Sequence, residues 1–71
     1  MANNLRLKLG KKISSLRKKH KLTQKELAEI ADIDYKYLQR IEGKKPPAIK
    51  IDTIGRFAKA FKVKPAELLD F

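Results

Sequence analysis

The 71-residue sequence contains no cysteine and no tryptophan, and it has a single histidine. Without cysteine there is neither a disulfide framework nor a thiolate metal site, and one histidine cannot build a metal cage. No run of apolar residues is longer than two, so neither a transmembrane span nor the hydrophobic region of a signal peptide can be placed. The sequence therefore predicts one cytoplasmic domain that is stabilised by packing and holds no metal or cofactor.

Carboxylates are also scarce, above all in the first third of the chain. Eight Asp and Glu stand against 18 Lys and Arg, which gives a formal net charge of +10, and residues 1–25 hold nine basic side chains and no acidic one. This balance favours a polyanionic partner, either nucleic acid or an anionic membrane surface. The alternative interpretation of the basic run is a solvated, lysine-rich helix that serves solubility alone.

The spacing of apolar residues predicts five helices and no strand. The first helix has an apolar stripe along residues 5–16, and Asn3 or Asn4 is expected to cap its start. Thr23 and Glu26 have the spacing of a capping box, which opens the second helix. The inward side chains of this helix are expected to be Leu27, Ala28, Ile30 and Ala31.

The second half of the chain continues the helical pattern. Asp34 is the expected cap of a short third helix, and the basic, proline-containing loop 44–47 cannot continue that helix. Asp52 or Thr53 is expected to open a fourth helix, and Pro65 a last short turn. The expected core residues of the fourth helix are Ile54, Phe57, Ala58 and Phe61.

The segment 22–43, LTQKELAEIADIDYKYLQRIEG, resembles the helix-turn-helix of the lambda-repressor-like family of bacterial and phage regulators. The match includes the pattern L-T-Q-x-E-L-A at the start of the motif, the apolar Ile33 in the turn, and the pair Ile41-Glu42 at the end of the third helix. The flanking sequences agree as well, so the resemblance extends from about residue 5 to residue 69. It implies an all-α, five-helix DNA-binding domain that occupies residues 1–71, with residues 1–3 expected to be flexible.

The geometry of the DNA major groove explains independently why a helix-turn-helix suits DNA recognition. A major groove about 12 Å wide accepts one α-helix, so a small protein must carry that helix on a protruding part of its surface. The outward face of the third helix is predicted to carry Tyr35, Lys36, Gln39 and Arg40. Lysine and arginine suit the acceptors of guanine, and glutamine suits the edge of adenine, so these four residues are expected to read bases.

The resemblance also implies contacts with the DNA backbone and an internal ion pair. The positions expected to bind phosphate are Gln24, Tyr37, Lys44 and Lys45. Arg17 and Glu42 match the family's ion pair between the first helix and the end of the recognition helix. Two departures from the family pattern are Asp32, which stands where a glycine is common and is expected to be left-handed, and Gly43, which directly follows the glutamate.

These observations predict a transcriptional regulator that binds double-stranded DNA, in the cytoplasm or nucleoid of a bacterium or in a phage-infected cell. One helix reads few base pairs, so a homodimer on a palindromic operator is expected, with half-sites about 34 Å apart. The candidate interface residues are Leu68, Leu69 and Phe71, and packing of the two leucines onto the first helix of the same chain is the alternative. No membrane partner or small-molecule effector is expected.

The other classes of function are a membrane-surface protein, an enzyme and a protein-interaction module. The first helix is amphipathic and basic, but its apolar stripe has no Trp or Phe and the later helices carry stripes that need a partner, so mutual burial is favoured over a membrane surface. No nucleophile with a base and an orienting partner, no paired carboxylates and no glycine-rich phosphate loop is recognisable, so the sequence does not predict an enzyme. A protein-interaction module is the remaining alternative, for example an antitoxin that neutralises a toxin and binds DNA secondarily.

Overall fold

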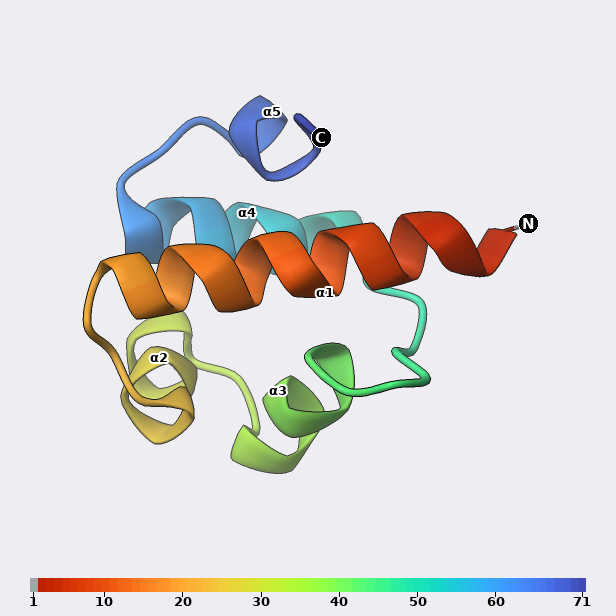
Figure 1. Ribbon diagram of the computed structural model, residues 1–71. Helices are drawn as coiled ribbons and strands as arrows, with labels where there is room; N and C mark the ends of the chain where they lie inside the picture. Colours follow the sequence, from red (N-terminus) through yellow and green to blue (C-terminus); the bar gives the residue numbers. More distant parts are fainter. Residues whose placement is uncertain (1) are drawn as a thin grey trace.

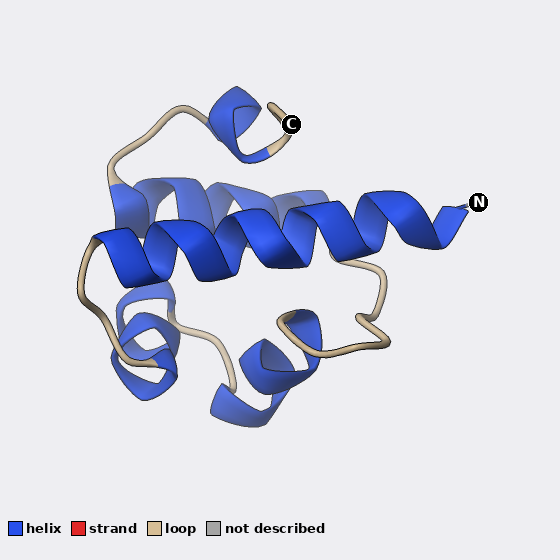
Figure 2. Cartoon of the chain, viewed as in Figure 1, coloured by secondary structure: helices blue, strands red, loops and turns tan. Residues whose placement is uncertain are grey.

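The computed structural model describes the backbone of residues 2–71 and the side chains of residues 4–71. The chain consists of helices joined by loops (Figure 2). The helices are α1 (Ala2–Lys19), α2 (Gln24–Ala31), α3 (Tyr35–Ile41), α4 (Ile51–Phe61) and α5 (Pro65–Leu68). Residues 2–71 contain no strand, so the predicted all-α, five-helix fold is confirmed. Of the stretch expected to be flexible, Met1 lies outside the described residues, and Ala2 and Asn3 belong to α1.

The long helix α1 crosses the front of the molecule in Figure 1, with α4 behind it, α5 above it, and α2 and α3 below it. α4 packs against α2 and α5, α1 packs against α4 and α5, and α2 packs against α3. As a result α3 lies at the opposite edge of the molecule from α5. Every helix within residues 2–71 is too short or too polar to cross a lipid bilayer.

The core is formed by one apolar side of each helix. Phe57 and Phe61 of α4 lie at its centre with 0% and 1% of their surface exposed, as predicted. The other buried apolar residues are Leu9, Ile13, Leu27, Ala28, Ala31, Leu38, Ile41, Ile54, Ala58 and Leu68. Burying a large apolar side chain fully contributes about 1.5–3 kcal/mol, so these residues are the main source of stability in a chain this small.

The predicted capping box opens α2. The Thr23 hydroxyl accepts a hydrogen bond from the Glu26 amide at 3.0 Å, and the Glu26 carboxylate accepts one from the Thr23 amide at 2.8 Å. The expectation that Ile30 points inward is wrong, because 55% of this side chain is exposed. α4 covers the face of α2 that carries Leu27, Ala28 and Ala31, and Ile30 falls beside that face.

Two other expected helix starts need correction. α1 begins at Ala2, so Asn3 and Asn4 lie within the helix and not at the position before its start. α4 begins at Ile51 after Lys50, which makes no side-chain cap, whereas Asp52 or Thr53 was expected there. The backbone at Lys50, the residue that precedes α4, is extended. Its carbonyl oxygen accepts hydrogen bonds from the amides of Thr53 and Ile54. These backbone hydrogen bonds start α4 without a side-chain cap.

Candidate nucleic-acid interface

The surface of α3 divides cleanly into an inner and an outer side. Leu38 and Ile41 are fully buried, and Asp34 caps the helix by accepting a hydrogen bond from the Lys36 amide at 3.0 Å. The four residues expected to read bases are all exposed, namely Tyr35, Lys36, Gln39 and Arg40. A short helix anchored by two buried side chains thus presents a row of hydrogen-bonding groups to the solvent.

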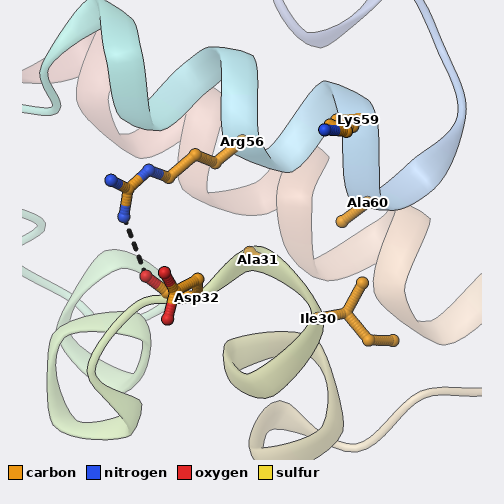
Figure 3. Close-up of a pocket in the computed structure, with 6 residues that line it drawn as sticks. All are labelled: Ile30, Ala31, Asp32, Arg56, Lys59 and Ala60. Carbon is orange, nitrogen blue, oxygen red and sulfur yellow. Dashed lines mark hydrogen bonds between the residues drawn. The ribbon is translucent and has the colours of Figure 1, made fainter.

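The tight turn between α2 and α3 depends on a left-handed aspartate. Asp32 has φ 58° and ψ 50°, and its amide bonds back to carbonyls of α2, as the departure from the family's glycine led us to expect. The turn is also held from outside, because the Arg56 guanidinium of α4 donates a hydrogen bond to the Asp32 carbonyl at 2.8 Å (Figure 3). Sequence reasoning missed Arg56, since no local pattern links it to a residue 24 positions earlier.

An ionic network joins the first three helices behind α3. The Arg17 guanidinium donates two hydrogen bonds to the Glu42 carboxylate, at 2.9 and 3.0 Å, and a third to the Leu22 carbonyl at 2.8 Å. The Gln24 side-chain amide donates to the same carboxylate at 3.2 Å. The side chains of Arg17 and Glu42 are 13% and 6% exposed. The network therefore fixes the start of α2 and the end of α3 relative to α1.

α1 and α3 also approach each other closely at a residue that sequence reasoning did not single out. Gly10 is buried, and a Cβ atom at this position would overlap the carbonyl oxygen of Ile41 at the end of α3. The helices can lie this close only because Gly10 has no side chain. The signal was present in the sequence as a glycine inside a helical pattern, but which backbone it contacts depends on the fold.

The residues expected to bind phosphate lie on α3 or on segments next to it. Gln24 lies at the first position of α2, where it engages Glu42. Tyr37 is half-buried, with its hydroxyl 3.5 Å from the Ala48 carbonyl oxygen in the loop after α3. Lys44 and Lys45 are exposed on that same loop. All four therefore lie on α3, on the loop that follows it, or at the start of α2.

The candidate dimer residues do not share one environment. Leu68 is fully buried in the core and cannot form an interface, so that expectation is wrong; its side chain is used to pack α5 onto the rest of the domain. Leu69 and Phe71 are 50% and 51% exposed. The Lys8 ammonium group lies 5.7 Å from the centre of the Phe71 ring, and Leu69 lines a groove with Arg6 and the apolar residues Leu5, Leu9, Ala48 and Ile49.

The fold and this surface together define a helix-turn-helix DNA-binding protein. The chain belongs to the family of the Cro/C1-type HTH DNA-binding domain, whose model matches residues 12–71. The family membership confirms the predicted resemblance. Within residues 2–71, no three or more His, Cys, Asp or Glu side chains are grouped so as to hold a metal ion.

Proteins similar to the chain include one control protein and two proteins of known structure. The control protein C.BamHI of Bacillus amyloliquefaciens is 36% identical over 72 residues, which cover all of this chain and 88% of that protein. The restriction-modification controller protein C.AhdI of Aeromonas hydrophila has a similar structure, with a TM-score of 0.83 and 27% identity over 89% of this chain and 94% of the other. The hypothetical transcription factor NHTF from Neisseria gives a TM-score of 0.84 and 29% identity over 92% and 74% of the two chains.

Proposed function

We propose that the protein is a homodimeric transcriptional regulator that binds a palindromic operator and controls a restriction-modification system. α3 enters the major groove of each half-site, and Tyr35, Lys36, Gln39 and Arg40 read the base edges. The observation that carries this proposal is that all four lie exposed on α3 while Leu38 and Ile41 anchor the helix from behind. The role in restriction and modification rests on the similarity to C.BamHI and C.AhdI.

Phosphate contacts hold the domain in register on the duplex. Gln24 reaches the backbone from the start of α2, and its hydrogen bond with Glu42 holds the side chain in place. Tyr37 donates its hydroxyl proton to a phosphate oxygen in place of the Ala48 carbonyl, from which the hydroxyl lies 3.5 Å away, and Lys44 and Lys45 offer positive charge from the loop after α3. These contacts position the protein without selecting a sequence.

A second copy of the chain covers the exposed apolar residues near the C-terminus. Leu69 and Phe71 are each about half exposed, and Leu5, with 63% of its surface exposed, lines the same groove as Leu69. Covering such side chains removes apolar area from water, which stabilises association by about 25 cal/mol per Å² before the costs of binding. Pairing also doubles the number of base pairs read, which a single α3 cannot supply.

Selection of bound sequences from a random library of DNA duplexes tests the proposal. The expected result is a two-part, inverted-repeat motif with half-site centres one helical turn apart, or a multiple of it. Arg40→Ala and Lys36→Ala should each relax the preference at particular base pairs, whereas Lys44→Ala should weaken binding and leave the motif unchanged. A library that yields no enriched sequence would overturn the proposal and favour a protein-interaction role.

Sedimentation measurements at micromolar concentration test the dimer. The unmodified protein should sediment as a dimer, and Leu69→Ser, which changes a half-exposed residue of the groove, should shift it toward the monomer. Ile30→Ser is a matched control, because Ile30 is an equally exposed apolar residue on α2, outside the groove that Leu5 and Leu69 line. A strict monomer, both free and bound to the selected duplex, would overturn the dimer.

A further inference from the structure

The N-terminal half of α1 and the loop after α3 enclose a basic hollow. Arg6 and Leu7 of α1 line it on one side, and Lys44, Lys45 and Pro46 of the loop line it on the other. In Figure 1 the loop runs beneath the N-terminal half of α1. Arg6 is far from the lysines in the sequence, so only the fold brings the three cations together.

The charges in this hollow have no acidic counterpart within the described residues. The lining contains no carboxylate, and the single ion pair recorded within residues 4–71 joins Arg17 to Glu42. Three positive charges held together repel one another, and an anion placed between them relieves this repulsion. The buried Pro46 and the half-buried Leu7 form the apolar part of the wall, and the three cations are exposed, so an anion can reach them from the solvent.

We propose that Arg6 joins Lys44 and Lys45 in binding a phosphate of the DNA backbone, which makes α1 part of the DNA-binding surface. This inference rests on the proposed function and extends its contact surface beyond the helix-turn-helix. The planar guanidinium group of arginine donates two parallel hydrogen bonds to a phosphodiester, whereas each lysine acts as a point charge. The loop follows α3 directly, so the phosphates at the edge of the groove that α3 enters are the ones within its range.

The salt dependence of binding to a random-sequence duplex measures this contact without knowledge of the operator. Each phosphate contact contributes about 0.9 to the slope of log Kobs against log salt concentration. Arg6→Gln should make the slope shallower by about 0.9 for each bound chain, and Lys44→Gln should also reduce it. When the salt concentration rises from 50 to 200 mM, the affinity of the unmodified protein should fall by about 3.5-fold more, for each bound chain, than the affinity of Arg6→Gln. Arg6→Lys keeps the charge and should keep the slope.

Lys64→Gln is the matched control, because it removes one positive charge directly before α5. The helix α5 lies on the side of α1 away from α3 (Figure 1). Lys64 makes no side-chain cap, so its replacement should leave both the fold and the slope unchanged. An Arg6→Gln slope equal to that of the unmodified protein, with Lys44→Gln shallower, would overturn this inference alone. An equal change in Lys64→Gln would also overturn it, by indicating an effect of net charge. Failure of the unmodified protein to bind duplex DNA would instead overturn the proposed function.

Discussion

Gly10→Ala should destabilise the protein, although alanine is normally the better residue inside a helix. Alanine is favoured over glycine in helices by about 0.5–1 kcal/mol. Here the added methyl group would overlap the carbonyl oxygen of Ile41 and lie 3.4 Å from its carbonyl carbon. A backbone carbonyl at the end of α3 cannot rotate away as a side chain can, so α1 and α3 must move apart. Overpacking of this kind costs about 1–3 kcal/mol.

Subtracting the helix preference from the middle of the overpacking range leaves a net loss of roughly 1 kcal/mol in the free energy of unfolding. For a domain of this size, a loss of about 1 kcal/mol lowers Tm by about 4–8 °C. Urea unfolding and thermal melts followed by far-UV circular dichroism measure both quantities.

Gly55→Ala is the matched control in α4, where an added Cβ would meet nothing within 4 Å. This variant should gain about 0.5–1 kcal/mol, so the two glycine substitutions should change stability in opposite directions. The reasoning is refuted if Gly10→Ala is at least as stable as the unmodified protein. It also fails if Gly55→Ala loses as much stability as Gly10→Ala.

Three further predictions concern the helix ends and the ionic network. Thr23→Ala should lower the free energy of unfolding by about 1 kcal/mol through loss of the capping box, whereas Thr53→Ala, in a helix without a side-chain cap, should change it by less than about 0.5 kcal/mol. Asp32→Gly should raise the free energy of unfolding, measured in urea, by roughly 0.5–1 kcal/mol, because φ is positive at this position. A loss of stability would contradict this account of the turn. Glu42→Gln should lower the free energy of unfolding by about 3 kcal/mol, because the Arg17 side chain, which is only 13% exposed, loses its carboxylate partner. Equal stability of the variant in urea would count against a structural role for the pair.

Local signals in the sequence predicted most of the fold correctly. The capping box at Thr23, the cap at Asp34 and the proline at the start of α5 each act within a few residues, so the sequence alone reveals them. Helix starts without a side-chain cap, as at Lys50, leave no such signal. The orientation of Ile30 was not predictable for a different reason, because α2 has only two turns and the position of α4 decides which side is covered.

The candidate site shows the same division between local and long-range information. Burial of Leu38 and Ile41 follows from helical spacing, and it leaves the opposite side of α3 exposed. The contacts of Arg56 with the turn and of Gly10 with α3, and the hollow that Arg6 lines together with the loop, join segments that are distant in sequence. Leu68 was ambiguous because an apolar residue near a terminus fits a dimer interface and a core equally well; packing of α5 onto α1 and α4 decided between them.

The exposed side of α3 is energetically separate from the rest of the domain. Within residues 4–71, the side chains of Tyr35, Lys36, Gln39 and Arg40 make no hydrogen bond or ion pair, and none of them belongs to the core. Replacing such residues usually changes stability by less than about 0.5 kcal/mol. Under the proposed function, substitutions at these four positions change the preferred DNA sequence while the fold stays the same, so regulators with separate targets can be engineered on one scaffold.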